Sequence, residues 1–177
     1  MRLCFRDLTI RNAEGTDAAQ LCAWWNDGRV MAHAGFPNGL GTTAEKIAAS
    51  LATDSDDTRR RLIIEYRGRP IGEMNYRLTD AKTAEIGIKI CDFSMQEKGL
   101  GRMFLSMLCQ ALFGRGCEKI ALDTNLNNLR AQHVYELLGF QKLGVRYDCW
   151  EDQLGRPQSA VDYALTPETF HDFTLGV

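Results

Sequence analysis

A glycine-containing turn between a strand and a helix is the feature that most restricts how this chain can fold. The turn covers residues 96–101, with the sequence Gln-Glu-Lys-Gly-Leu-Gly. An apolar, strand-like segment, residues 84–90, precedes it. Residues 102–115 follow it and have the three- and four-residue apolar spacing of an amphipathic helix. The face that we expect to be buried carries Leu100, Met103, Phe104, Met107, Leu108, Ala111 and Leu112.

Residues 119–123 have the composition of a further strand, so the whole stretch predicts a parallel strand–helix–strand unit with a right-handed crossover. A glycine turn at a helix start exposes backbone N–H groups at the positive end of the helix dipole, which favours binding of a phosphate or pyrophosphate. Two common phosphate-binding motifs that contain such a turn do not fit this sequence. A P-loop needs Lys and Ser or Thr after its last glycine, where this chain has Arg102 and Met103. A dinucleotide fingerprint needs a third glycine at the position of Phe104.

A third pattern fits in full. Gln96, Gly99 and Gly101 match the Gln/Arg-x-x-Gly-x-Gly/Ala pyrophosphate loop of the GNAT N-acetyltransferase superfamily. The next expected helix resembles that superfamily's Asn-x-x-Ala-x-x-x-Tyr-x-x-x-Gly-Phe motif at every defined position. The matching residues are Asn128, Ala131, Tyr135, Gly139 and Phe140. The two motifs stand in the expected order on the expected elements, so the sequence resembles the GNAT superfamily over residues 86–140.

The flanks resemble the branch that includes ribosomal-protein N-terminal acetyltransferases. Trp24, Asp27 and Val30 match its Trp-x-x-Asp-x-x-Val start, and residues 144–165 resemble its closing hairpin. The resemblance implies an α/β (α+β) GNAT fold in one domain over residues 1–177. We expect a mixed, mostly antiparallel sheet of about seven strands with a splayed parallel pair, flanked by about four helices. The strands expected from composition include one over residues 3–11 and a hairpin joined at residues 67–69. The helices expected near the N-terminus cover residues 16–27 and 43–51.

The resemblance implies acetyl-CoA as cosubstrate, with no metal. The turn would supply N–H groups and positive charge to the pyrophosphate, two isoleucines would line the pantetheine arm, and an asparagine would bond that arm. The expected cofactor-binding residues are Ile88, Ile90, Gln96, Lys98, Gly99, Leu100, Gly101, Arg102 and Asn128. Asn128 is also a good helix N-cap, and the two roles are compatible. Glu97 would place a negative charge near the phosphates.

The implied reaction is direct attack of a primary amine on the thioester, which needs a neutral amine, a stabilised oxyanion and a proton for the thiolate. By resemblance Tyr135 is the general acid, whereas helical periodicity alone predicts a core tyrosine. Glu85 is the expected base, acting through water, and its alternative is a surface glutamate paired with an arginine. Glu73 and Asp148 are weaker candidates for the base. The oxyanion donor implied by the family is a backbone N–H near Ile90.

Trp24 is the expected acceptor-site residue, and packing on the surface is its alternative. The acceptor is either a small-molecule amine or a protein N-terminus, and the protein a monomer or homodimer. The alternative to an enzyme is a CoA-binding sensor or interaction domain without turnover. A net charge of −2 gives no footprint for nucleic acid. No apolar run approaches the roughly 20 residues that span a bilayer, and no secretory signal is visible, so we expect a cytoplasmic protein without membrane contact. The six cysteines show no zinc-site spacing.

Overall fold

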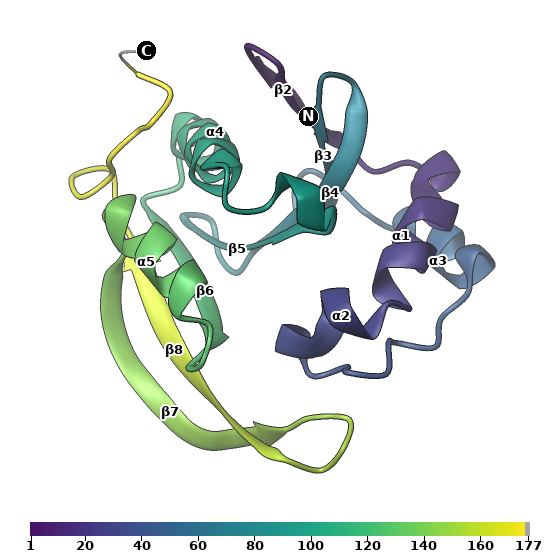
Figure 1. The fold of residues 1–177 in the computed structure, drawn as a ribbon. Coiled ribbons are helices and arrows are strands. Elements are labelled where there is room, and N and C mark those ends of the chain that lie inside the picture. The colour runs from purple at the N-terminus through teal and green to yellow at the C-terminus, as the bar shows by residue number, and fades with distance from the viewer. Residues whose placement is uncertain (176–177) are drawn as a thin grey trace.

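The computed structural model describes residues 1–175, and all eight of its strands belong to one sheet (Figure 1). The last two residues of the predicted domain lie outside the described range. The strand order across the sheet is β1-β2-β3-β4-β5-β6-β8-β7. The strands are β1 (Arg2–Phe5), β2 (Leu8–Asn12), β3 (Arg59–Tyr66), β4 (Arg69–Leu78), β5 (Thr83–Ile90), β6 (Lys119–Asn125), β7 (Gln141–Glu151) and β8 (Pro157–Leu165). The helices are α1 (Ala18–Trp25), α2 (Gly28–Met31), α3 (Ala44–Leu51), α4 (Leu100–Gly114) and α5 (Leu129–Leu137).

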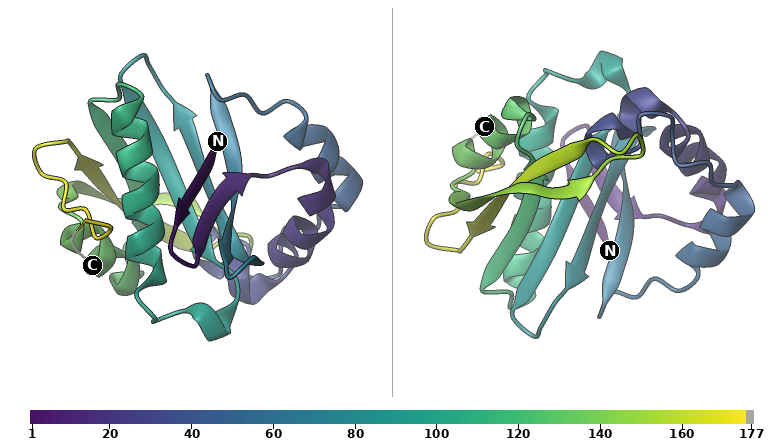
Figure 2. Two further views of the ribbon diagram at one scale, coloured as in Figure 1. Left: turned by 90° about the horizontal axis from the view of Figure 1, so that it is seen from above. Right: turned by 90° about the horizontal axis from the view of Figure 1, so that it is seen from below.

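The two faces of the sheet are covered by different helices (Figure 2). On one face α4 and α5 contribute to the main core, which also contains Leu62, Met74 and Ile86. Phe104 of α4 is fully buried there, and its truncation to alanine would cost about 3–5 kcal/mol. On the other face α1 and α3 cover Ile63 of β3. The strand alternation of β3 therefore assigns its neighbouring residues to two separate cores.

The sheet splits between β5 and β6. All other neighbouring strands are antiparallel, and β5 and β6 form the one parallel pair among the described strands. Their pairing is limited to the register partners Thr83–Lys119, Ala84–Ile120 and Glu85–Ala121. Beyond Glu85, β5 stays paired with β4 up to Ile90, while β6 stays paired with β8 up to Asn125. The predicted splayed parallel pair and GNAT architecture are thus confirmed.

Two details of the N-terminal region differ from the sequence prediction. The single strand expected over residues 3–11 is wrong: the chain folds into a β1–β2 hairpin that turns at Arg6, whose φ of 51° is left-handed. This hairpin raises the strand number from about seven to eight. The helix expected over residues 16–27 is shorter, because Asp27 caps the start of a separate α2 through its side chain and the Arg29 N–H.

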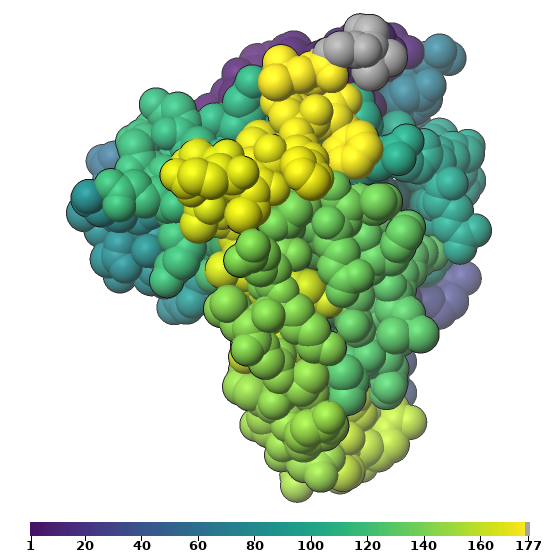
Figure 3. All heavy atoms as spheres, turned by 90° about the vertical axis from the view of Figure 1, so that its left-hand side faces the viewer, coloured from purple at the N-terminus to yellow at the C-terminus, as the bar shows by residue number. Residues whose placement is uncertain are grey.

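The C-terminal segment ties α4 to α5 (Figure 3). Phe170 packs its ring on Phe113 with 5.6 Å between centroids, and the Phe173 N–H donates to Ser106 Oγ at 3.0 Å. The His171 N–H donates to the carbonyl of Leu138 at the end of α5. These bonds fix the two helices that flank the split in the sheet.

The β7–β8 hairpin at the opposite end contacts the loop that follows α2. The turn after β7 reaches the loop after α2, where the Gln153 N–H donates to the Gly35 carbonyl at 2.7 Å (Figure 1). The Gln153 side chain accepts from Asn38 N at 2.9 Å and donates to the Gly39 carbonyl at 3.0 Å. Trp150 lies so close to Gly35 that a Cβ there would be 2.4 Å from the indole ring. We call this connection, residues 150–153 on residues 35–39, the strap.

Across residues 1–175 no helix is both long and apolar enough to traverse a bilayer. In the same part of the chain, no three His, Cys, Asp or Glu side chains are grouped so that they could hold a metal ion.

Candidate active site

The free edge of β5 forms one wall of a gap in the sheet. Gln96 Nε2 donates to the carbonyl of Ile90 at 2.8 Å, so this carbonyl points away from β4. In a strand the N–H and C=O of one residue point to the same edge, so the Ile90 N–H faces the gap as well. The next residue, Cys91, turns its N–H the other way and donates to Ile71 at 2.8 Å. Gln96 therefore fixes the turn to the end of β5 and leaves one N–H directed at the gap.

The turn at residues 96–101 leaves the start of α4 open. Thr43 and Asn128 cap α3 and α5 through their side chains, but the N-cap of α4 is Gly99, which has φ of 74° and brings no capping side chain. The first N–H groups of a helix have no partner within it, and the helix dipole makes this end positive. Such an end fits an anion.

The charges around the turn favour an anion as well. Lys98 and Arg102 line the same cleft as the turn. Glu97 has its negative charge matched by Arg130 of α5, with 3.2 Å between Oε1 and Nη1. The carboxylate that the sequence placed near the phosphates is thus held by an arginine from the neighbouring helix.

A cleft of about 1010 Å³, which we call the turn cleft, runs from this turn into the gap between β5 and β6. Its walls include the turn, the start of α4, the free edge of β5 and one side of α5. All nine residues predicted to bind the cofactor line it: Ile88, Ile90, Gln96, Lys98, Gly99, Leu100, Gly101, Arg102 and Asn128. Asn128 accepts from the Ala131 N–H, as a cap does, and donates to Thr124 Oγ1 at 3.3 Å.

Tyr135 lies in the turn cleft with 6% of its surface exposed. Its ring packs on Phe140 and Tyr163, each with 5.8 Å between centroids, so its position is fixed by the core. No group within residues 1–175 makes a hydrogen bond to its hydroxyl. Burial, with smaller contributions from Asp123 and Tyr163, raises the pKa of Tyr135 to about 12. Its hydroxyl therefore keeps a proton at neutral pH.

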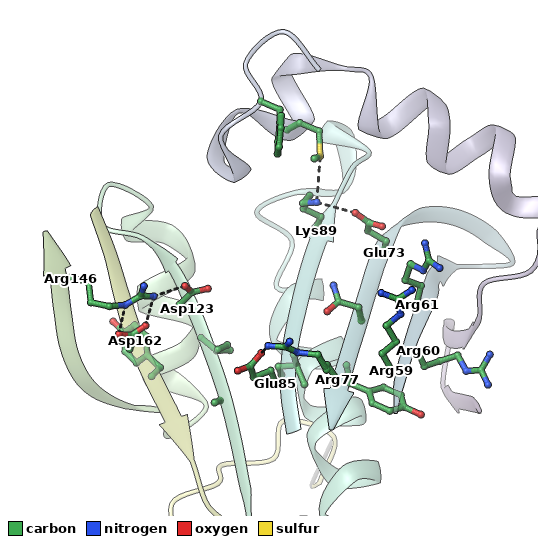
Figure 4. A pocket seen from close by; sticks show the side chains of 18 of the residues that line it. Arg59, Arg60, Arg61, Glu73, Arg77, Glu85, Lys89, Asp123, Arg146 and Asp162 are labelled. Carbon is green, nitrogen blue, oxygen red and sulfur yellow. Dashed lines mark hydrogen bonds and ion pairs between the residues drawn. The ribbon is translucent and has the colours of Figure 1, made fainter. Parts of the chain in front are cut away.

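A second cleft, of about 890 Å³, opens on the sheet face that carries Ile63. We call it the arginine cleft, because Arg59, Arg61, Arg77 and Arg146 stand on its walls (Figure 4). The turn cleft and the arginine cleft share four lining residues, Glu73, Asn75, Lys89 and Asp123. Two ligands bound in the two clefts would therefore meet at these residues.

Glu73 is the most enclosed carboxylate at this junction, with its side chain 8% exposed. Lys89 Nζ and Trp25 Nε1 both donate to its Oε1, at 3.0 and 2.9 Å. No group among the described residues bonds Oε2. The charged pair holds the carboxylate in one orientation and leaves one oxygen for a third partner.

Comparisons with known proteins agree with this architecture. Residues 7–141 match the model of the acetyltransferase (GNAT) domain. The chain belongs to the GNAT acetyltransferase family. Acetyl-CoA is the acetyl donor of GNAT enzymes, so the predicted class of reaction and its cosubstrate are confirmed. No curated protein sequence matches the chain.

Several solved structures share the GNAT fold. Spermidine N-acetyltransferase from Vibrio cholerae, in complex with CoA and spermine, has a TM-score of 0.80 at 22% identity, covering 93% of this chain and 98% of that one. Ribosomal-protein-S5-alanine acetyltransferase from Vibrio fischeri has a TM-score of 0.81 at 16% identity, with 97% and 99% covered. RimL, a ribosomal L7/L12 alpha-N-protein acetyltransferase in complex with coenzyme A, has a TM-score of 0.80 at 16% identity, with 94% and 98% covered. At these identities the likeness shows the fold.

The GNAT fold brings together some of the predicted site residues and separates others. Tyr135 and the nine cofactor-binding residues share the turn cleft. Glu85 lines the arginine cleft instead, half exposed, and its Oε2 accepts from Arg77 Nη2. Asp148 is exposed on β7 and lines neither cleft. Trp24 packs against the α1–α3 core and is also absent from both linings, whereas its neighbour Trp25 lines the arginine cleft.

Sequence reasoning about this GNAT chain missed three of the four junction residues, Asn75, Lys89 and Asp123. It also missed Trp25, which donates to Glu73 from the arginine cleft. Strand alternation had placed Lys89 on the face of Glu85, but it gave no sign of the partner Glu73 on β4. Asp123 stands near the carboxyl end of β6, where the parallel strands diverge. A carboxylate at the carboxyl end of a parallel strand is a signal that was available in the sequence.

Proposed function

We propose that this GNAT acetyltransferase transfers an acetyl group from acetyl-CoA, bound in the turn cleft, to a primary amine bound in the arginine cleft. The observation that carries the proposal is the junction of the two clefts at Glu73, Asn75, Lys89 and Asp123. Tyr135, a protonated and well-fixed phenol, lies on the turn-cleft side of this junction. An acid and a carboxylate thus stand on the two sides of the place where two ligands would meet.

The turn cleft fits the cosubstrate. The uncapped start of α4 and the side chains of Lys98 and Arg102 suit a pyrophosphate, and Ile88 and Ile90 give the gap an apolar wall suited to a pantetheine arm. Asn128 has a carboxamide at the same cleft for the amide groups of that arm. When bound, acetyl-CoA supplies the reactive thioester and a thiolate as leaving group.

The proton donor is Tyr135. A thiolate needs a proton as it departs, and a buried phenol that keeps its proton at neutral pH is a suitable donor. The Ile90 N–H, which faces the gap, is the donor for the developing oxyanion. Neither group needs to move into place, because Tyr135 is held by two rings and Ile90 by the strand.

Glu73 is our candidate for the group that removes a proton from the amine, directly or through water. Its free Oε2 lies at the junction, whereas the carboxylate of Glu85 is engaged by Arg77 outside the turn cleft. The expected base on β5 is therefore replaced in this proposal by the carboxylate that faces Lys89 across the β4–β5 ladder. Substitution of each glutamate in turn decides between them.

Direct attack by the amine is favoured over an acetyl-cysteine intermediate. Cys91 is the thiol next to the junction, and burial, together with the charge of Glu73, raises the pKa of that thiol to about 12. A thiol with this pKa is almost wholly protonated at neutral pH and is a poor nucleophile. The amine is then the group that attacks.

The test is release of free CoA thiol from acetyl-CoA in the presence of a panel of primary amines, with mass spectrometry of the acetylated amine. Thiol release that depends on the amine supports the enzyme. Tight CoA binding, measured by calorimetry, with no amine-dependent thiol release across the panel would instead indicate the alternative function, a CoA-binding sensor.

A further inference from the structure

The floor of the arginine cleft is formed by side chains that stand opposite one another on neighbouring strands. Register pairs place Arg61 opposite Asn75, and Asn75 opposite Gly87. One row further along the sheet, Arg59 stands opposite Arg77, which stands opposite Glu85. Two arginines directly opposite each other repel, so this arrangement is unfavourable unless negative charge compensates it.

The compensation within the protein is incomplete. Asp54, whose side chain is fully buried, accepts from Arg61 Nη2 at 2.7 Å and lies 3.6 Å from Arg59 Nε. Arg77 has Glu85 as its partner. The three arginines on this face therefore share two carboxylates, which leaves one positive charge in excess. Arg60 also lines the cleft, but Asp56 matches its charge, so it does not change this balance.

The unbalanced charge is accessible. The side chains of Arg59 and Arg77 are 55% and 63% exposed, and both line the arginine cleft. Each guanidinium has five N–H donors in a planar fork. Arg77 gives one hydrogen bond, to Glu85, and Arg59 gives one, to Thr53 Oγ1 at 3.2 Å. Most donors of both forks remain available to a planar or tetrahedral anion.

The opposite wall of the cleft has an excess of negative charge. There Arg146 is shared between Asp162, at 2.7 Å, and Asp123, at 2.8 Å, which leaves one negative charge in excess (Figure 4). Asp123 also lines the turn cleft, near the junction where the amine would react. A ligand with a cationic amine at one end and an anion at the other would match both walls.

We infer that the acceptor of the proposed acetyl transfer is an amine that also carries a carboxylate or phosphate, bound by Arg59 and Arg77. This inference rests on the proposed function for the identity of the amine end. Neighbouring strands are about 4.8 Å apart and residues two apart on a strand about 6.8 Å, so a backbone position in the arginine row lies roughly 7–8 Å from one in the Asn75–Gly87 row on the same or the next strand. The anion should stand at about this distance from the nitrogen. Polyamines should bind poorly, because their second ammonium group would face the arginines.

The experiment compares ligands that differ only in the anion. The pairs are 6-aminohexanoate with hexylamine for a carboxylate, and glucosamine 6-phosphate with glucosamine for a phosphate; spermidine represents polyamines. Binding is measured first, by calorimetry on the protein saturated with CoA. We expect at least one amine that carries an anion to bind about tenfold or more tightly than its partner without the anion, the increment of one charge-assisted contact of about 1.4 kcal/mol. The preference should weaken as salt is raised.

The variants are Arg59→Gln, Arg77→Gln and the double substitution. We expect each to reduce binding of the anion-bearing member of the pair severalfold and to leave binding of the member without the anion unchanged. Arg67→Gln is the matched control, since Arg67 is an exposed arginine paired with Asp7 and lines neither cleft. Thermal melts establish that the variants fold.

The outcomes separate this inference from the proposed function. Equal binding of ligands with and without the anion, tighter binding of spermidine, or no detectable binding of any of them would overturn the inference, whatever the turnover. Arginine variants that lose affinity equally for both members of a pair would overturn it as well. Failure of every bound amine to release CoA thiol would overturn the proposed function, whatever the arginine variants do.

Discussion

The two clefts of this protein are built from different materials. The turn cleft takes its charge from backbone N–H groups at an uncapped helix start, with Lys98 and Arg102 beside them, and most of its wall from residues 87–105 and α5. The arginine cleft takes its charge from ion-paired side chains on β3, β4, β5, β6, β7 and β8. A substitution changes a side chain but leaves the backbone N–H groups in place. We therefore expect substitutions to alter binding of the acceptor more readily than binding of the cosubstrate. The following predictions test this difference between the two clefts.

The largest effect should come from Tyr135→Phe, which removes the proposed proton donor and little else. Loss of a general acid typically costs about 10²–10⁴-fold in rate, so we expect kcat to fall at least about 100-fold. The KM values of both substrates should change little, because the ring stays packed on Phe140 and Tyr163. Steady-state kinetics measure this, and an unchanged kcat would remove Tyr135 from the mechanism.

Glu73→Gln and Glu85→Gln form the next test, because they distinguish the junction from the open part of the arginine cleft. We expect Glu73→Gln to lower kcat by roughly 10–100-fold through loss of the base. The exposed pair of Glu85 with Arg77 is worth about 0–1 kcal/mol, so Glu85→Gln should stay within about fivefold of wild type. Both are read from kcat/KM with a saturating cosubstrate, after a melt establishes that each folds. The reverse order of the two effects would make Glu85 the base.

Gly99→Ala should weaken the turn cleft alone. Gly99 has φ of 74°, and an added Cβ would lie 3.3 Å from Arg102 Nε. The left-handed conformation costs a non-glycine residue about 1–2 kcal/mol, so we expect KM for acetyl-CoA to rise about fivefold or more while KM for the amine stays constant. Gly114→Ala, at the end of the same helix with open space around its Cα, is the control and should change neither constant. A parallel rise in the amine KM would contradict the division between the clefts.

The two adjacent tryptophans provide a smaller contrast. Trp25→Phe removes the hydrogen bond from Nε1 to Glu73 but keeps an aromatic ring, and Lys89 continues to hold the carboxylate. One such bond contributes about 1 kcal/mol, so we expect kcat/KM for the amine to fall about threefold to fivefold. Trp24→Phe should leave it unchanged. If only Trp24→Phe lowered kcat/KM for the amine, Trp24 would be the acceptor-site residue, as the sequence predicted.

The pH dependence should show no contribution from Tyr135. An ordinary tyrosine has a pKa near 10, but burial raises that of Tyr135 to about 12. A raised pKa keeps the phenol protonated, so the ratio of wild-type kcat to that of Tyr135→Phe should stay constant between about pH 8 and pH 10. A ratio that declines over this range would mean that the phenol ionises there.

The sequence located the part of the turn cleft that local motifs encode. Periodicity located α4, and two motifs on successive elements supplied Gln96, Gly99, Asn128 and Tyr135, all of which line that cleft. The arginine cleft depends on strand register, which no local pattern encodes. Glu85 and Lys89 share a face of β5, but the structure was needed to show that β6 diverges after Glu85 and that Glu73 stands beside Lys89.

The N-terminal errors have the same cause. Arg6 and Asp7 interrupt the β1–β2 hairpin with ordinary residues in place of glycine, so the sequence offers no turn signal where the left-handed φ of Arg6 reverses the chain. Trp24 and Trp25 are neighbours on one helix, and periodicity alone assigns each to a face without saying what packs there. Long-range packing places Trp25 on Glu73 and Trp24 in the α1–α3 core.

The strap gives the split sheet a mechanical property. Two sheet halves that share a short parallel pairing at one end would act as the arms of a hinge, free to open and close around their contents. Gln153, bonded to Gly35, Asn38 and Gly39, gives the β7–β8 half a second attachment, to the loop after α2. Opening of the gap beyond the β5–β6 pairing would therefore have to break these three hydrogen bonds or move the loop along with the hairpin.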